Sequence, residues 1–407
     1  MHHAPQVTGL DRVEPMHSTP RIRQAYLDYN ATAPLRPEAR AALLDVLEAP
    51  SNASSVHAEG RAARARIERA RAAVAQLIHA VPAGVTFVSG GTEANMMALT
   101  PDYQIDGEAI RLARLFVSAV EHPSVLAGGR FQASEVTVLP VDENGRVVPE
   151  KLAAALDADV PDGSRFLVSV MLANNETGVL QPIAEIAEIV SNRGGLLHVD
   201  AVQAVGRIAV DMAALGADLL SLSGHKIGAP PGVGALVRRR EGVRPAPVLT
   251  GGGQESRLRS GTENAAAIAG LGAVVESILE DRTLLPGMTE LRDRLETGLL
   301  DIAADTVIFG RDVPRIPNTV CFAVPGIQAE TALISLDLAG ISVSSGSACS
   351  SGKVAASHVL AAIGVEPVLA GAALRISMGW ATIPEDIDRF LEVWVRVVDR
   401  IRRKSGK

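Results

Sequence analysis

A lysine and an aspartate stand where two apolar runs of the sequence end. Lys226 follows residues 217–222, Ala-Asp-Leu-Leu-Ser-Leu, and Asp200 follows residues 195–199, Gly-Leu-Leu-His-Val. The intervening stretch leaves room for one helix and one strand, so both side chains can reach the same edge of a parallel sheet. Such a lysine can condense with an aldehyde, and the aspartate can keep a pyridine nitrogen protonated, which predicts a pyridoxal phosphate site. Taken alone, Lys226 is better explained as a solvated strand-end lysine.

A glycine-rich turn upstream could supply the phosphate site. Residues 85–88, Val-Thr-Phe-Val, have a strand pattern, and residues 89–95, Ser-Gly-Gly-Thr-Glu-Ala-Asn, lead into a helix expected to begin near Thr92. At Gly91 and Thr92 the backbone can approach an anion, which the N–H groups of a first helical turn bind. The spacing fits neither a dinucleotide-binding fold nor a P-loop. An ordinary turn has the same pattern, so the signal is weak by itself.

Three more polar residues follow predicted strands. His122 comes after residues 115–120, Asn175 after residues 166–171, and Gln203 soon after Asp200. Ligands of open α/β sheets bind outside the carboxyl ends of the strands. An imidazole there can stack on a pyridine ring, and the two amides can donate to its phenolic oxygen. His122 could instead cap the following helix.

Together these segments resemble a known family. Eight motifs follow one another in the order that is typical of cysteine desulfurases: residues 26–32 (YLDYNAT), 89–93 (SGGTE), 121–122 (EH), 174–178 (NNETG), 198–203 (HVDAVQ), 223–226 (SGHK), 259–262 (RSGT) and 344–349 (SSGSAC). This resemblance implies a fold-type I pyridoxal phosphate enzyme of the class V aminotransferase-like branch. It also implies a large domain with a mostly parallel, seven-stranded type of sheet flanked by helices, and a smaller α+β domain. The expected reaction takes sulfur from free L-cysteine and leaves alanine.

The predicted nucleophile is Cys349. It lies in residues 344–352, a polar stretch with five serines and two glycines, of the kind that carries functional groups. Only a thiolate is nucleophilic, and Lys353 is close enough in sequence to favour one. An incidental surface cysteine is the alternative from the residues alone. Cys321, in the apolar run 318–324, is expected to be a buried and inert strand residue.

The resemblance assigns further roles. It implies that Lys226 holds the cofactor and moves protons, that His122 stacks on the ring and also moves protons as a catalytic residue, and that Cys349 attacks the substrate sulfur to become a persulfide. Residues implied to contact the cofactor are Gly91, Thr92, His122, Asn175, Asp200, Gln203, Ser223, His225, Lys226 and Thr262. Residues implied to contact the substrate are Asn30, Asn175 and Arg375, the last because a guanidinium can bind a carboxylate. From periodicity alone, a salt bridge at a sheet edge explains Arg375 equally well. In the family the threonine corresponding to Thr262 reaches the phosphate of the other subunit, so a homodimer is expected.

Two departures from the family pattern bear on the acceptor and on one loop. Residues 254–258 are Gln-Glu-Ser-Arg-Leu, where many long-loop desulfurases have Gln-Glu-Arg-Gly. The chain ends at residue 407 without the longer tail that housekeeping iron–sulfur desulfurases present to their scaffold protein. The sulfur acceptor therefore stays open between an iron–sulfur scaffold and a sulfur carrier for other pathways such as transfer-RNA thiolation.

Composition indicates a soluble enzyme. The chain has 407 residues, of which 47% are hydrophobic and 21% charged, enough for two domains. A net charge of −7 with 3% aromatic residues argues against nucleic acid and against anionic membranes as partners. With two cysteines the chain can form neither a disulfide framework nor a cysteine-rich metal site, and a cytoplasmic location is expected. Five arginines in residues 61–71 are best explained as a solvated helix face.

The predicted organisation has three parts. Residues 1–23 lack the apolar run of a signal peptide and are expected to be a flexible extension. Residues 24–283 are expected to form the large cofactor domain, and residues 284–407 the small domain with the Cys349 loop. The resemblance implies that the first residues of the large domain pack against the small one. From residue 264 onward the expected elements are helices at 264–282, 288–304, 328–339, 354–363 and 384–403 and strands at 318–324, 341–343 and 374–378.

Two other functions were weighed. One keeps the cofactor and changes the reaction to selenocysteine lyase, another C–S lyase or transamination, but a transaminase has no use for a thiol at Cys349. The other is a catalytically silent sulfur-relay scaffold, which needs neither Lys226 nor Asp200. The presence of all three residues favours the desulfurase.

Overall fold

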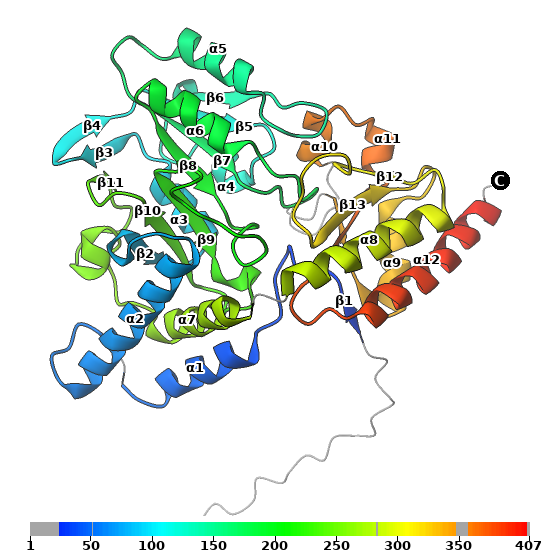
Figure 1. Cartoon of the computed structure of the whole chain (residues 1–407), viewed down its shortest axis with the longest axis horizontal. Coiled ribbons are helices and arrows are strands. Elements are labelled where there is room, and N and C mark those ends of the chain that lie inside the picture. The colour runs from blue at the N-terminus through cyan, green and yellow to red at the C-terminus, as the bar shows by residue number, and fades with distance from the viewer. Residues whose placement is uncertain (1–23, 51, 282–283, 347–356, 405–407) are drawn as a thin grey trace, which may run out of the picture.

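The structure, a computed structural model, describes residues 24–50, 52–281, 284–346 and 357–404. The predicted extension 1–23 and Cys349 lie outside these residues. Figure 1 shows a large α/β body and, beside it, a smaller body that contains the C-terminal helix. Within the described ranges no helix combines the length and the apolar character needed to span a membrane.

The large body is built on a seven-stranded sheet of order β2-β10-β9-β8-β7-β5-β6. The pairs from β9 through β8, β7 and β5 to β6 are parallel, and β10 runs antiparallel to both of its neighbours. This confirms the predicted mostly parallel sheet. The strands are β2 Val85–Val88, β5 Arg114–Ser118, β6 Val136–Leu139, β7 Phe166–Met171, β8 Leu196–Asp200, β9 Leu219–Ser223 and β10 Gly234–Arg238.

Central strands of this sheet are apolar on both faces because each face is covered. Alternate residues such as Val168 and Val199 pack in one core with α1 Pro37–Leu47, α2 Ala58–Leu77, α5 Pro149–Asp159, α6 Ile183–Asn192 and α7 Ala265–Glu280. Their neighbours Leu167 and Leu196 pack in a second core with α3 Gly91–Ala98, α4 Pro123–Leu126 and a small sheet of β3 Asp102–Ile105, β4 Glu108–Arg111 and β11 Val243–Pro245.

The smaller body has its own core. A four-stranded sheet of order β12-β13-β16-β15 contributes Phe322, which packs against Phe390 and Trp394 of the last helix. The first strand of the chain, β1, pairs in parallel with β14, so the N-terminal segment lies against this body. The elements are β1 Ala25–Tyr26, α8 Leu284–Ile302, β12 Val307–Ile308, β13 Thr319–Ala323, α9 Ala329–Leu338, β14 Ile341–Ser342, β15 Ser344–Ser345, α10 His358–Ala362, α11 Pro367–Ala370, β16 Leu374–Ser377 and α12 Pro384–Lys404.

One expectation about elements was wrong. The connection from Asp200 to Lys226 contains turns, β9 and a short 3-10 helix but no α-helix, because residues 201–218 form a succession of turns. The two strands are nevertheless direct neighbours, with Asp200 paired to Ser221, so both residues reach the same edge. The helix expected at 354–363 is described only from His358, and α11 was not expected at all. The boundaries after residues 23 and 283 remain predictions.

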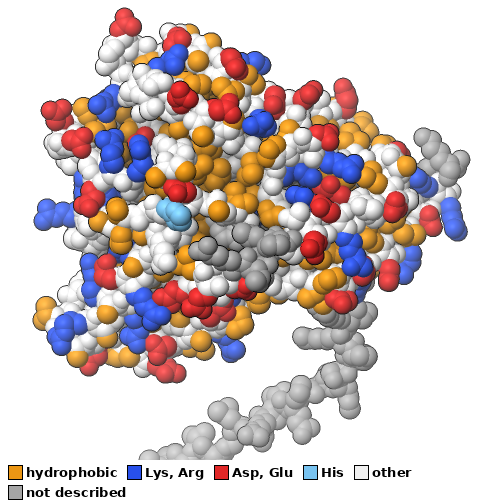
Figure 2. All heavy atoms as spheres, in the orientation of Figure 1, with side chains coloured by type: hydrophobic (Ala, Val, Ile, Leu, Met, Phe, Trp, Pro, Cys, Tyr) orange, Lys and Arg blue, Asp and Glu red, His pale blue; other side chains and the backbone are white. Residues whose placement is uncertain are grey.

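Charged side chains of both signs alternate over the face shown in Figure 2. The arginine-rich helix α2 follows this pattern, since Arg64, Arg66 and Arg69 each pair with a carboxylate. Arg71 departs from the solvated face that was expected: it is buried and pairs with Glu255. This helix therefore offers paired charges rather than a free basic stripe.

Candidate active site

A cavity of about 300 Å³ opens at the carboxyl ends of the parallel strands. Segments distant in sequence line it, since β7, β8 and β9 end there, α3 begins there, and His122 reaches it from the loop after β5. It contains nearly all of the cofactor and substrate residues expected from the sequence: Asn30, Gly91, Thr92, His122, Asn175, Asp200, Gln203, Ser223, His225, Lys226 and Arg375. Among the described residues, Thr262 is the exception.

Lys226 ends the short 3-10 helix Gly224–Lys226 that directly follows β9. Its Nζ donates to the backbone oxygens of Asn30 at 2.7 Å and Ala31 at 2.8 Å. The amine is thus anchored in the cavity rather than solvated at a strand end. Since Lys226 lines the cavity, its nitrogen is within reach of an aldehyde bound there.

Both oxygens of the Asp200 carboxylate accept hydrogen bonds. The Asn95 side chain donates to Oδ2 at 2.8 Å, and the backbone N–H of Val202 donates to Oδ1 at 3.0 Å. Asn95 was missed from the sequence, although it lies one turn after Thr92 on the same helix face, which was the available signal. These two donors hold the carboxylate in one orientation at the wall of the cavity.

His122 both caps a helix and lines the cavity. Its Nδ1 accepts from the Ser124 N–H at 3.1 Å at the start of α4. Burial lowers the pKa of His122, and the nearby Lys226 and His358 lower it further, whereas Asp200 opposes this shift. Because Nδ1 is the acceptor, the proton of the neutral imidazole lies on Nε2. The neutral ring can therefore stack on a flat cofactor and exchange a proton at Nε2.

The expected phosphate end of the cavity is held by glycines and by an ion pair. Position 234 of β10 requires glycine because the neighbouring backbone comes very close: a Cβ there would lie 2.6 Å from the Leu222 oxygen and 2.8 Å from Gly90 Cα. Behind it, Glu93 accepts from Arg259 at 2.9 Å and from the backbone N–H of Ser89. The turn before α3 is therefore held in place with its N–H groups at the cavity.

Next to this turn, His225 carries a neutral imidazole. Burial lowers its pKa to about 4, and the charges of Lys226 and Arg207 add to the effect. A neutral ring can donate one hydrogen bond to a phosphate oxygen. In addition, the buried Oδ1 of Asn175 has no hydrogen-bond partner among the described residues. A cavity with these donors and an unpartnered polar atom fits pyridoxal phosphate.

Arg375 lies on β16, between β13 and β15, so it is not at a sheet edge as its alternative explanation required. Its guanidinium nevertheless forms a salt bridge, to Asp28 at 2.7 Å, and donates to the Asn175 backbone oxygen at 3.1 Å. Its buried Nε has no partner within the part of the chain that the structure describes. The residue can thus present donors to a carboxylate in the cavity while Asp28 holds it.

Thr262 does not line this cavity. It lines a separate one together with Phe87, Glu255 and Arg259. The loop that carries it passes through three consecutive left-handed residues, Glu255 to Arg257. Glu255 holds this loop through Arg71. Within a single chain, therefore, Thr262 is not positioned for the chain's own cavity.

The expected nucleophile, Cys349, lies outside the described residues, which resume at Ser357. Ser357 caps α10 and donates to the Glu176 carboxyl, whose pKa burial raises to about 7. The next residue, His358, bonds through Nε2 to the Glu121 backbone oxygen at 2.9 Å. Cys321 is buried in β13 as predicted, and burial raises its thiol pKa.

Buried ionisable residues near the cavity were the main omission from the sequence analysis. Glu121 and Glu176 belong to motifs that were noted without a role, and Arg207 was not singled out. Burial raises the pKa of Glu121 to about 8, and Asp200 adds to the rise. No pattern of spacing marks such residues, because their burial depends on contacts with distant segments, such as Ser357 for Glu176 and Asn30 for Arg207. The described residues contain no group of three metal-ligating side chains.

Known proteins resemble the chain over most of its length. Residues 25–390 match the family model described as Aminotransferase class-V. The cysteine desulfurase IscS of Dictyoglomus turgidum is 41% identical over 392 residues, 94% of this chain and 96% of that protein. Among solved structures, the NifS-like protein from Rickettsia africae has a TM-score of 0.83 at 34% identity, covering 92% of this chain and 99% of its own. SspA in complex with cysteine has a TM-score of 0.71 at 26% identity, covering 88% and 99%.

Proposed function

Because the chain belongs to the class V aminotransferase family and, within it, to the pyridoxal phosphate enzymes known as cysteine desulfurases, we propose the following roles for its residues. The substrate is L-cysteine, the amino acid present in the related SspA complex. The products are L-alanine and a persulfide on Cys349. The observation that carries the proposal is the convergence of Lys226, Asp200 and Arg375 on one cavity from three separate segments.

Pyridoxal phosphate, when bound, supplies an aldehyde that takes up an amine and a ring that accepts electron density. Lys226 would hold it covalently, and Asp200 would face the ring nitrogen. The N-terminal turn of α3, Ser223 and His225 would hold the phosphate. Gln203 and Asn175 would contact the phenolic oxygen.

Substrate binding relies on charge and shape. The Arg375 guanidinium can hold the cysteine carboxylate in bidentate fashion, with Asn175 next to it. Asn30 supports this side of the cavity, since its Nδ2 donates to the Asn175 backbone oxygen at 3.0 Å. The amino acid is thereby placed with its amine toward Lys226.

Protons and sulfur are then handled by separate groups. Lys226 Nζ removes and returns the proton at the substrate α-carbon, and His122 exchanges one through Nε2. The Cys349 thiolate attacks the substrate sulfur, so a new S–S bond forms as the substrate C–S bond breaks. The carbon left behind takes up a proton and becomes the methyl group of alanine.

The persulfide then passes to an acceptor protein, either an iron–sulfur scaffold or a sulfur carrier. We place the enzyme in a reducing cytoplasm, where such a persulfide and its acceptor thiols persist. A homodimer completes the site: Thr262 of each subunit would reach the phosphate held by the other. The separate cavity of Thr262 in a single chain supports this arrangement.

Mass spectrometry after incubation with L-cysteine, without reductant, tests the proposal. The holoenzyme should gain sulfur on Cys349 and not on Cys321. Cys349→Ser should keep the bound cofactor but lose alanine production by several orders of magnitude, because a hydroxyl is scarcely ionised at neutral pH. Cys321→Ala is the matched control and should turn over normally. Full activity of Cys349→Ser would instead indicate a selenocysteine lyase or a general C–S lyase.

A further inference from the structure

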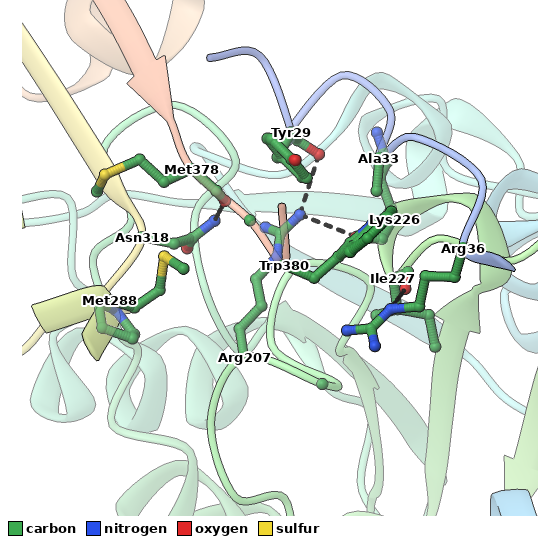
Figure 3. A pocket seen from close by; sticks show the side chains of 13 residues that line it. Tyr29, Ala33, Arg36, Arg207, Lys226, Ile227, Met288, Asn318, Met378 and Trp380 are labelled. Carbon is green, nitrogen blue, oxygen red and sulfur yellow. Dashed lines mark hydrogen bonds between the residues drawn. The ribbon is translucent and has the colours of Figure 1, made fainter. Parts of the chain in front are cut away.

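A second, smaller cavity of about 50 Å³ lies behind Lys226, between the two bodies of the molecule. Figure 3 shows two arginines on its walls, Arg36 and Arg207, with Lys226 between the segments that carry them. Arg36 lies over the Trp380 ring at 5.4 Å and approaches Glu38 at 3.4 Å. The two arginines therefore share one environment but have different partners.

Arg207 is buried, and its guanidinium bonds go to neutral oxygens in the described part of the chain. It donates to Asn30 Oδ1 at 2.8 Å and to Gln203 Oε1. It also donates to the backbone oxygens of Tyr29 at 3.2 Å and Lys226 at 3.3 Å, the contacts dashed in Figure 3. Burial lowers the pKa of Arg207 to about 9, so it remains a cation at neutral pH. Burying a cation among neutral groups costs free energy, so its presence here calls for a functional explanation.

These contacts decide how two amides of the active site are turned. A guanidinium has donors only, so the oxygen end of the Gln203 amide must face Arg207. Its Nε2 then lies at the other end, where it donates to the Asn30 backbone oxygen at 3.1 Å, and Gln203 itself lines the larger cavity. The Asn30 amide is oriented in the same way, with Oδ1 toward Arg207 and Nδ2 toward Asn175 and Thr319, each at 3.0 Å.

The same network reaches the catalytic lysine. The Asn30 backbone oxygen accepts from both Gln203 Nε2 and Lys226 Nζ. Arg207 also contacts the backbone of Lys226 directly. One cation therefore connects the lysine to the amide expected at the phenolic oxygen of the cofactor.

We propose that Arg207 is a positioning residue of this active site, which turns the Gln203 amide so that its N–H2 group faces the cofactor. The inference rests on the proposed function and adds to it a residue that does not itself line the larger cavity. Arg207 acts through Gln203 and touches neither substrate nor cofactor. Arg36, on the same small cavity, has no contact with either amide and serves as the control.

A double-mutant cycle on the cofactor-loaded enzyme tests this role. Arg207→Lys keeps the charge but loses the planar fork, so kcat should fall about tenfold to 100-fold, the scale of a misplaced catalytic contact, while KM changes much less. The pH titration of the cofactor's absorption band should shift in the same variant. In a Gln203→Leu background Arg207→Lys should add little, because the residue it acts through is gone. Arg36→Lys should leave kcat and the titration unchanged.

A second variant keeps the test valid if Arg207→Lys fails to fold. Gln203→Glu preserves the oxygen that accepts from Arg207 and replaces the opposite N–H2 with a second oxygen. The expected result is a folded protein that binds the cofactor but has lost turnover, because the new oxygen cannot donate to the cofactor and meets the Asn30 backbone oxygen on its other side. Unchanged turnover in Gln203→Glu, or full additivity in the cycle, would overturn the proposal. Turnover of L-cysteine by the wild-type protein is measured first: if there is none, the proposed function is refuted, and the titration of the cofactor band in the variants still tests Arg207.

Discussion

Replacing Glu255 by glutamine should lower the free energy of unfolding by about 3 kcal/mol. Glu255 accepts from Arg71 through both oxygens at 2.8 Å each, and from the Phe87 N–H at 2.9 Å. Both side chains are buried, with 9% of Arg71 and 2% of Glu255 exposed. Glutamine keeps the shape but leaves Arg71 as a buried cation without its bidentate partner, a change that destabilises by about 3–5 kcal/mol. The lower end applies because Glu68 still contacts Arg71 at 3.0 Å.

A matched control lies on the same helix. Arg69 forms an equally bidentate pair with Glu276, at 2.7 Å for both bonds, but 76% of its side chain is exposed. Glu276→Gln should therefore change the free energy of unfolding by less than about 1 kcal/mol. Urea denaturation of the cofactor-loaded protein, at one protein concentration for all variants, measures both effects. If the two variants lose the same stability, the reasoning from burial is refuted.

Three further substitutions address the cofactor site. Thr262→Ala should weaken cofactor binding by about 1–3 kcal/mol, the value of a hydrogen bond to a charged group, in equilibrium dialysis; an active monomer in sedimentation would contradict its role between subunits. Gly234→Ala should lower both the thermal midpoint and cofactor affinity, because its Cβ would press on the Leu222 oxygen; an unchanged midpoint would show that the strands can part there. Burial raises the pKa of Glu121 from 4.5 to about 8, so the folded protein keeps a proton that the unfolded chain loses, and stability falls as pH rises through that interval. Glu121→Gln cannot ionise and should lose less stability than wild type between pH 6 and pH 9 in urea titrations; equal losses would show that Glu121 is not the cause.

Strand ends were the part of the site that sequence reasoning located well. Lys226, Asp200 and His122 each follow an apolar run, and parallel strands bring the ends of such runs together. The prediction that Asp200 and Lys226 reach the same edge of the sheet was confirmed, since β8 and β9 are direct neighbours. The helix expected between these two strands is absent from the connection. Arg375 and Ser223 needed the family resemblance, since nothing in their own spacing points to a ligand.

Contacts across long sequence distances were beyond the reach of sequence patterns. Arg71 and Glu255 pair over 184 positions, and in the sequence Arg71 is one arginine among several on a polar helix. Arg207 has no acidic neighbour in its network, so charge pairing could not identify it either. Asn95 is different, because its helical spacing from Thr92 was a signal that could have been used. Burial, which decides the charge and the role of these groups, is a property of the assembled fold.

Borohydride reduction of the purified holoenzyme, followed by peptide mapping, tests most directly whether this cavity holds pyridoxal phosphate on Lys226. Reduction makes the bond between a lysine and the cofactor permanent, so the modified peptide identifies the lysine. The account predicts an adduct on Lys226, and none in Lys226→Ala, which should retain the cofactor only noncovalently and should not turn over L-cysteine. An adduct on another lysine of the wild-type protein would contradict the assignment of Lys226 and of the cavity built around it.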